Sequence, residues 1–299
     1  MDILTIKGLT KSFGDKKVLC GLDLSVPEHS IFGFVGRNGA GKTTTMKAIL
    51  GLLKTDDGEI YVAGERVAYG QTPTNKFIGY LPDVPQFYSF MTAREYLTLC
   101  GESLNMKKSD ITERTEELLT LVGLAEETHR IKGFSRGMKQ RLGIAQALFA
   151  RPKLLICDEP TSALDPIGRK EILDLLYSVR EQTTVLFSTH ILSDVERICT
   201  EVALINDGKI AMNGTVDELK RITSSEQFAI ELMDSEHADA ILNRFQNAHR
   251  SENGTLMLKG GDEQLHLALD FMHQNGISLR KIERFGASLE SVFEEVVKK

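Results

Sequence analysis

The stretch Ile31-Phe-Gly-Phe-Val-Gly-Arg-Asn-Gly-Ala-Gly-Lys-Thr-Thr44 decides the fold of this chain. Its first five residues are an apolar run that predicts a buried strand, and the pattern over 43–52 predicts a helix. The turn between them keeps the spacing G-x-x-x-x-G-K-[ST], which is typical of loops that bind phosphate. The alternative is a glycine-rich turn without a ligand, and the strand and helix on either side disfavour it.

This loop provides each group that a multiply charged anion requires. Its glycines let backbone N–H groups curl around phosphates, and the helix N-terminus adds free N–H donors and a favourable dipole. Lys42 places a cation on the β and γ oxygens, and Thr43 offers a hydroxyl to Mg²⁺. The predicted nucleotide-binding residues of the loop are Gly36, Arg37, Asn38, Gly39, Ala40, Gly41, Lys42, Thr43 and Thr44.

Apolar runs and helical patterns alternate along much of the chain. Short β-like runs at 4–9 and 19–26 precede the loop, and a mainly helical part occupies 92 to about 150. Further strands are predicted at 58–67, 78–81, 154–157, 184–188 and 202–205, and further helices near 169–180 and 193–199. The predicted fold class is α/β, a P-loop ATPase core with a mostly parallel sheet, a helical insertion and an antiparallel β portion.

The pattern changes after about Arg221. The residues that follow alternate short strand-like and helical segments, predicted at 228–232, 238–247, 255–258, 263–274 and 288–297, with a hairpin-like Asn253-Gly254. We therefore expect two domains, residues 1–220 with a helical subdomain at about 91–150, and a small α+β accessory domain over 221–299.

Composition narrows the possible functions. The 299 residues are 41% hydrophobic, and 42 acidic against 36 basic residues give a net charge of −6, which argues against nucleic acid as a partner. The four cysteines lie too far apart in sequence to signal a disulfide framework or a zinc site, so a reduced, cytoplasmic setting is expected. No stretch approaches the roughly 18 apolar residues that span a bilayer. We therefore expect any membrane role to require a partner.

Two adjacent carboxylates follow the apolar run at 154–157. At the end of a strand in a nucleotide-binding sheet, Asp158 would hold Mg²⁺, and Glu159 would polarise the attacking water. Alone, such a pair is more often a solvated strand end. The phosphate-binding loop upstream favours the catalytic interpretation.

Three more motifs follow one another in a fixed order: Phe134-Ser-Arg-Gly-Met-Lys-Gln-Arg141, Ser162-Ala-Leu-Asp165 and Ser188-Thr-His190. Together with the loop and the carboxylates, they make residues 1 to about 220 resemble the ABC ATPase family, with these segments as its signature, D-loop and switch histidine. The resemblance implies an ATP-binding domain that hydrolyses ATP as a homodimer or heterodimer.

The resemblance also assigns roles to single residues. Ser135 and Gly137 would contact the γ-phosphate of ATP on the opposite subunit, and Asp165 would belong to the same composite site. His190 would act on the γ-phosphate or hold the water, although a lone histidine after a strand is usually structural. Phe13 occupies the position of an adenine-stacking aromatic, and a core phenylalanine is its alternative.

The chain departs from the family pattern at two of these motifs. Asp83 stands where the family usually has Gln, so we expect a shorter carboxylate to contact Mg²⁺ or water there, with Gln86 as a possible substitute. In the signature, Arg136 and Met138 replace the more common Gly and Gln. The site is nevertheless expected to be active.

The remaining features favour a transporter. The segment Gly286-Ala-Ser-Leu-Glu-Ser-Val-Phe293 resembles the closing segment of exporter ATPases, although an amphipathic helix packed on its own domain also explains it. Residues near 91–99 match the family's contact with a membrane partner, and the aromatic residues Phe87, Tyr88 and Phe90 fit either a partner groove or a core. We expect an ATPase that drives a separate transmembrane permease at the cytoplasmic face of the cell membrane. A soluble ABC-type ATPase or another P-loop enzyme is the alternative.

Overall fold

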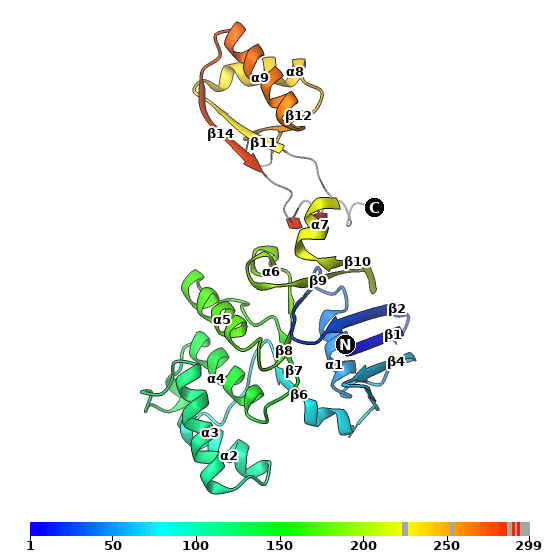
Figure 1. The fold of residues 1–299 in the computed structure, drawn as a ribbon, viewed down its shortest axis with the longest axis vertical. Helices are drawn as coiled ribbons and strands as arrows, with labels where there is room; N and C mark the ends of the chain where they lie inside the picture. Colours follow the sequence, from blue (N-terminus) through cyan, green and yellow to red (C-terminus); the bar gives the residue numbers. More distant parts are fainter. Residues whose placement is uncertain (71, 223–226, 252–253, 286–288, 291, 294–299) are drawn as a thin grey trace. The chain divides into compact units, whose positions relative to one another are not determined.

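The computed structural model describes residues 1–70, 72–222, 227–251, 254–285, 289–290 and 292–293 (Figure 1). The chain divides into two compact units, Met1–Val216 and Asp217–Lys299, and each is described here by itself.

The larger unit is built on a six-stranded sheet with the order β10-β9-β3-β8-β7-β6. The five strands from β9 to β6 are parallel, and only β10 runs antiparallel to its neighbour. The strands are β3 (Ile31–Val35), β6 (Ile78–Leu81), β7 (Leu154–Asp158), β8 (Thr184–Thr189), β9 (Glu201–Asn206) and β10 (Lys209–Thr215). Every residue of β3, β7 and β8 is buried, as near-continuous apolar runs in a parallel sheet predict. The α/β prediction is confirmed.

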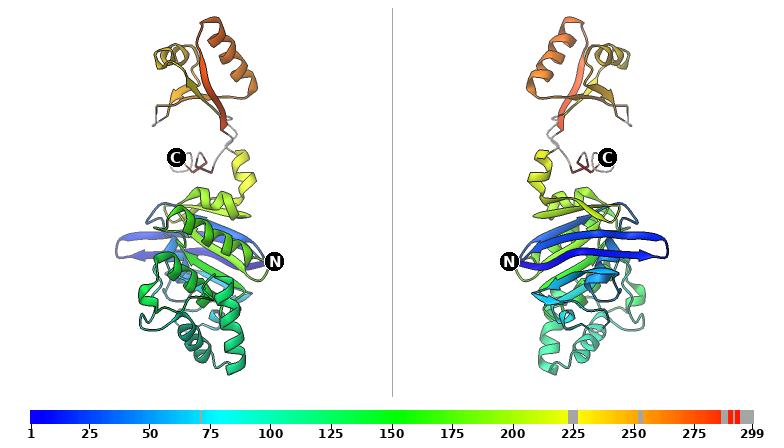
Figure 2. Two further views of the ribbon diagram at one scale, coloured as in Figure 1. Left: turned by 90° about the vertical axis from the view of Figure 1, so that its left-hand side faces the viewer. Right: turned by 90° about the vertical axis from the view of Figure 1, so that its right-hand side faces the viewer.

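A second sheet, antiparallel and four-stranded, has the order β2-β1-β4-β5. Its strands are β1 (Asp2–Phe13), β2 (Lys16–Pro27), β4 (Asp57–Val62) and β5 (Glu65–Arg66), and Figure 2 shows β1 and β2 as a long hairpin. The two hairpin strands are longer than predicted, because register shifts such as the one between Ile6 and Leu9 interrupt the alternation along each strand. Helix α1 (Lys42–Ile49) shares one hydrophobic core with both sheets.

Helices make up the rest of this unit. The helical part consists of α2 (Ala93–Ser103), α3 (Lys108–Leu121) and α4 (Arg136–Leu148), which gather away from β1, β2 and β4 in Figure 1. Shorter turns and the remaining helices are η1 (Pro73–Phe77), η2 (Ile131–Gly133), α5 (Pro166–Ser178) and α6 (Leu192–Ile198). The N-terminus of α2 is fixed by a reciprocal capping box between Thr92 and Glu95.

The second unit has the element order β-α-β-β-α-β of a ferredoxin-like fold, with the sheet order β12-β13-β11-β14. Its elements after α7 (Val216–Ile222) are β11 (Gln227–Leu232), η3 (Ser235–His237), α8 (Ala238–Arg244), β12 (Ala248–Arg250), β13 (Leu256–Lys259), α9 (Asp262–Gln274) and β14 (Leu279–Phe285). Residues of both helices, such as Ile241 and Met272, share a core with Phe228 and Leu258 of the sheet. The two helices therefore cover the same face of the sheet.

Sequence patterns found only part of this second unit. Strands β12 and β14 were not predicted, because β12 has three residues and β14 carries charges at four of its seven positions. Helix α8 ends at Arg244 rather than at 247. Asn253 of the predicted hairpin and most of the predicted helix at 288–297 lie outside the described residues.

Candidate functional site

The phosphate-binding loop and the two carboxylates predicted from sequence come together at one edge of the parallel sheet. Strands β3 and β7 both pair with β8, so the loops after their carboxyl ends lie close to one another. These loops line a cavity of about 280 Å³. Its lining residues are Asn38, Gly39, Gly41, Lys42, Thr43, Thr44, Asp83, Asp158 and Glu159.

Two glycines give the loop its tight path. A Cβ atom on Gly36 would lie 2.6 Å from the Ile205 side chain, and Gly41 combines a φ of +114° with a Leu19 methyl 2.8 Å from any added Cβ. No other residue fits either position without displacing its neighbours. Because Gly41 is the N-cap of α1, the first backbone N–H groups of that helix have no intrahelical acceptor and remain available to an anion.

Lys42 is buried at the base of the cavity. Its Nζ donates to the carbonyl oxygens of Gly36 at 2.6 Å and Arg37 at 3.3 Å, and it lies 3.2 Å from Oε1 of Glu159. The loop backbone therefore holds the ammonium group in place. A positive charge that is fixed and shielded from water interacts strongly with phosphate oxygens.

Glu159 has a strained backbone and a well-defined side chain. Its φ of +48° lies in the left-handed region, and its N–H donates to Ser188. Oε2 lies 2.9 Å from Nδ1 of His190, whereas Oε1 is buried and accepts no hydrogen bond within the described structure despite its proximity to Lys42. Strain of about 1–3 kcal/mol at a residue of this kind persists only where its surroundings hold it. The carboxylate is therefore held by His190 at one oxygen and by the Lys42 charge near the other.

Asp158 is buried beside it and accepts a hydrogen bond of 2.6 Å from the Ser188 hydroxyl. Burial, with a smaller contribution from the Asp158 charge, raises the pKa of Tyr80 to about 12, so this neighbouring hydroxyl stays neutral. Burial also raises the pKa of the Cys157 thiol. Tyr80 and Cys157 are therefore neutral neighbours of the Asp158 carboxyl group. The sequence motif contained Ser188, but sequence reasoning gave it no role.

The donors around the cavity suit Mg²⁺. No three His, Cys, Asp or Glu side chains converge as a metal site among the residues that the structure describes. Mg²⁺ is usually held by one or two carboxylates together with substrate phosphates and waters, rather than by a cage of protein ligands. Asp158, Asp83 and the exposed Thr43 hydroxyl provide such a partial set at the cavity.

Asp83 lines the cavity but also has a partner on the signature segment. Its Oδ1 lies 3.2 Å from a guanidinium nitrogen of Arg136, which also donates to the Ser162 carbonyl at 3.0 Å. The Gln140 amide donates to the Asp83 carbonyl at 2.7 Å. Arg136 therefore links three of the predicted motifs. Gln86, the predicted substitute, is exposed and does not line the cavity.

The remaining predicted residues do not line the cavity of this single chain. Phe13 ends β1 with 51% of its surface exposed, which excludes the alternative of a core phenylalanine. Ser135 is the N-cap of α4, and a Cβ on Gly137 would meet no atom closer than 4.0 Å, so the start of α4 is open to a ligand. Asp165 is the N-cap of α5 and accepts the Gly168 N–H at 2.8 Å.

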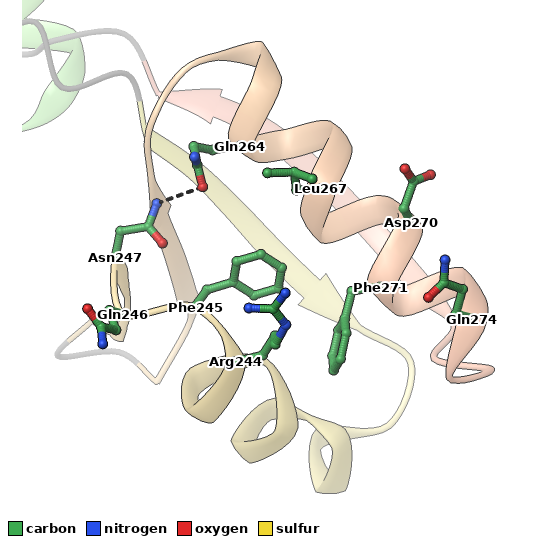
Figure 3. Close-up of a pocket in the computed structure, with 9 residues that line it drawn as sticks. All are labelled: Arg244, Phe245, Gln246, Asn247, Gln264, Leu267, Asp270, Phe271 and Gln274. Atoms are coloured by element: carbon green, nitrogen blue, oxygen red, sulfur yellow. Dashed lines mark hydrogen bonds between the residues drawn. The ribbon is translucent and has the colours of Figure 1, made fainter.

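A larger cavity, about 510 Å³, lies in the second unit (Figure 3). Its lining residues are Arg244, Phe245, Gln246, Asn247, Gln264, Leu267, Asp270, Phe271 and Gln274. The Phe245 and Phe271 rings meet edge to face at 5.7 Å, and Asn247 bonds to Gln264. None of the predicted site residues lies there, so cavity volume alone does not locate the chemistry.

None of the helices in the described part of the chain has the length and apolar character needed to cross a membrane.

A family model described as "ABC transporter" matches residues 19–162. The chain is 37% identical to the uncharacterized ABC transporter ATP-binding protein YxlF of Bacillus subtilis (strain 168), over 99% of each chain. It is 36% identical to the bacitracin transport ATP-binding protein BcrA of Bacillus licheniformis, over 99% of this chain and 97% of that one.

Solved structures show the same fold for the larger unit. The cbiO1 protein from Clostridium perfringens, described as part of the ABC transporter complex cbiONQ, is 26% identical. The alignment has a TM-score of 0.67 and covers 74% of this chain and 93% of that one.

Proposed function

Because this chain belongs to the family of ABC transporter ATP-binding proteins, we propose that it hydrolyses ATP with the residues of the β3, β7 and β8 loops to drive a transmembrane permease. ATP binding and hydrolysis are the family's activity, and its subunits work with transmembrane permease components. The assignment of single residues, the metal, the dimer and the direction of transport is our proposal.

The observation that carries the proposal is the convergence of Lys42 and Glu159 at one cavity, with His190 in contact with the Glu159 carboxylate. Lys42 and the N-terminus of α1 bind the ATP phosphates and offset the charge that develops on the transferred group. Glu159 orients the attacking water and accepts its proton, and His190 holds the Glu159 carboxylate from the other side. Mg²⁺, held by Thr43, Asp158 and Asp83, would neutralise charge on the phosphate oxygens.

A second subunit is part of this proposal. The open N-terminus of α4 at Ser135 and Gly137 does not face the cavity of its own chain, and it carries the free N–H groups that bind anions. We propose that it contacts the γ-phosphate of ATP bound to a second ATPase subunit, with Asp165 at the same interface. Hydrolysis then requires a homodimer or heterodimer.

The permease would bind close to the Asp83 loop at the membrane surface. Tyr88 and Phe90 are 55% and 62% exposed, and their ring centroids lie 5.9 Å apart. Tyr88 also lies 6.4 Å from Tyr96, which is buried and hydrogen-bonded to Gln146. Exposed aromatic side chains next to a buried aromatic residue favour binding of a protein partner. The similarity to a bacitracin transport ATP-binding protein over nearly the whole chain supports a role in transport. Of the segment at 286–293 that resembles exporter ATPases, Leu289 and Val292 are buried.

Affinity purification tests the proposed function. Tagged protein carrying Glu159→Gln is isolated with ATP from detergent-solubilised native membranes, and co-purifying proteins are identified by mass spectrometry. We expect a polytopic membrane protein that is absent when Lys42→Ala protein is used. Recovery of only ribosomal or DNA-associated proteins would instead support an ATPase without a role in transport.

Phe13→Ala is expected to weaken ATP affinity by about 5-fold or more, because base–aromatic stacking contributes about 1–3 kcal/mol. The free energy of unfolding should change little, because the side chain is already half exposed. Equilibrium binding of a fluorescent ATP analogue measures the effect. Tyr69→Ala, at a side chain that is 65% exposed, is the matched control and should bind normally. Equal affinities for the two variants would exclude the stacking role.

Asp83→Ala is expected to lower ATP turnover by about 10-fold or more, as loss of a group that supports a metal site typically does. The free energy of unfolding should change by less than about 1 kcal/mol, because the pair with Arg136 is nearly half exposed. Steady-state phosphate release and denaturant titration measure the two quantities. Glu65→Ala, which breaks an exposed pair with Lys76, is the control for both. Unchanged turnover would show that Asp83 serves only the ion pair.

A further inference from the structure

A buried carboxylate outside the cavity joins three segments that carry proposed site residues. Asp194 lies in the first turn of α6, and its side chain is 3% exposed. Its Oδ2 accepts a hydrogen bond of 2.7 Å from the hydroxyl of Thr161, and its Oδ1 accepts one from the guanidinium of Arg169. Both carboxylate oxygens are therefore engaged.

Each of these partners is close in sequence to a residue of the proposed mechanism. Thr161 follows Glu159 by two residues, and Asp194 follows His190 by four. Arg169 is one helical turn beyond Asp165, and its N–H donates to the Asp165 carbonyl at 2.9 Å. The ends of β7 and β8 and the start of α5 thus share one buried anchor.

The backbone around Thr161 requires such an anchor. Glu159 has a φ of +48° and Ala163 a φ of +53°, both in the left-handed region. Conformations of this kind are unfavourable for residues other than glycine and are kept only where the surroundings fix them. Thr161 lies between the two strained residues, is 1% exposed, and has its hydroxyl directed at Asp194.

We propose that Asp194 is a positioning residue for ATP hydrolysis. Through Thr161 it fixes the strained turn that presents the Glu159 carboxylate, and through its own segment it fixes His190 against Oε2 of Glu159. Arg169 pairs with the carboxylate of Asp194 and keeps it oriented. This inference rests on the proposed roles of Glu159 and His190, which Asp194 itself does not contact.

The first test is Asp194→Asn, which keeps the shape but removes the charge. We expect kcat for ATP to fall by about 10- to 100-fold, because small displacements of a reacting group cost up to about that factor. The KM and the dissociation constant for ATP should change by less than about 2-fold, since the phosphate-binding loop is not involved. Asp174→Asn is the matched control, because Asp174 pairs with Arg197 at 3.0 Å between the same two helices at the surface. Its kcat should stay near that of the unmodified protein.

A double-mutant cycle separates positioning from general destabilisation. Because both routes from Asp194 end at the Glu159 carboxylate, Asp194→Asn in a Glu159→Gln background should lower kcat by less than about 2-fold further. A merely structural role would multiply the two losses.

Thr161→Val should lose activity, whereas Thr161→Ser, which keeps the hydroxyl, should retain it. These two variants keep the charge of Asp194 paired, so they remain informative if Asp194→Asn lowers the Tm.

The turnover of Glu159→Gln, measured in the same series, distinguishes failure of the roles proposed for the site from failure of the positioning role of Asp194. If this variant keeps its turnover, the roles assigned to the site are wrong. If it loses turnover while Asp194→Asn behaves like Asp174→Asn, or while the losses from Asp194→Asn and Glu159→Gln multiply, only the positioning role is overturned. Loss of kcat at constant ATP affinity, non-additivity with Glu159→Gln, and activity in Thr161→Ser but not in Thr161→Val together establish the positioning role.

Discussion

Glu159→Gln lowers the turnover number for ATP by about 10²- to 10⁴-fold, the range that a positioned general base contributes. The amide keeps the size of the side chain and its place between Lys42 and His190, but it no longer accepts a proton from water. Phosphate release under saturating ATP measures the loss. Glu181→Gln, at a side chain that is 79% exposed, makes the same chemical change away from the site and should be silent.

The same substitution is expected to strengthen ATP binding. The Glu159 carboxylate lies 3.2 Å from the Lys42 ammonium and offsets part of the charge that attracts the phosphates. With the neutral amide, the dissociation constant for ATP should fall, and dimers held together by unhydrolysed ATP should accumulate. Size-exclusion chromatography with and without ATP shows this directly. A Glu159→Gln protein with undiminished turnover would falsify the assignment of Glu159 as the base.

Lys42→Ala weakens ATP affinity by on the order of 100-fold, because each hydrogen bond to a charged group contributes about 1.5–3 kcal/mol. The lysine is buried and held by the Gly36 and Arg37 carbonyls, so no other cation of α1 can take its place. Equilibrium binding of ATP measures the loss. Lys47→Ala, at the exposed end of the same helix, removes an equal charge and should bind ATP normally.

Loss of the Lys42 charge also affects the protein without ATP. It leaves the buried Glu159 carboxylate without its nearest cation, which costs stability because a buried charge needs a partner. Lys42→Met, which keeps the apolar stem, should be more stable than Lys42→Ala but bind ATP equally weakly. If Lys42→Met bound ATP as the unmodified protein does, the ammonium group would not be the phosphate ligand.

The sequence predicted the larger unit better than the smaller one, for physical reasons. Strands β3, β7 and β8 are fully buried, so their apolar runs are unbroken and their carboxyl ends carry recognisable motifs. Strand β14 is charged at four of its seven positions, and Lys281 and Glu283 within it pair with each other. No motif marks such a strand, so the ferredoxin-like order became visible only in the structure.

Within the site, the sequence predicted the residues that belong to motifs but not the residues that hold them in position. Lys42, Asp158 and Glu159 belong to patterns with fixed spacing, and the structure brings them to one cavity. Arg136 and Asp194 act on residues more than 25 positions away, Asp83 and Thr161, so that only tertiary contacts reveal them. The Arg136 contact also explains how a carboxylate at position 83 is accommodated beside the signature segment.

The order of strands in the parallel sheet has a consequence for the nascent chain. Strand β3, which carries the phosphate-binding loop, is made early, yet it lies between β8 and β9, and Gly36 packs against Ile205 of β9. Until residues up to Asn206 have emerged from the ribosome, this strand lacks its β9 neighbour, even after β8 has emerged. ATP therefore cannot stabilise the chain during the first stages of synthesis. Only after β9 has emerged can the site fold and bind ATP, and this binding then stabilises the folded state.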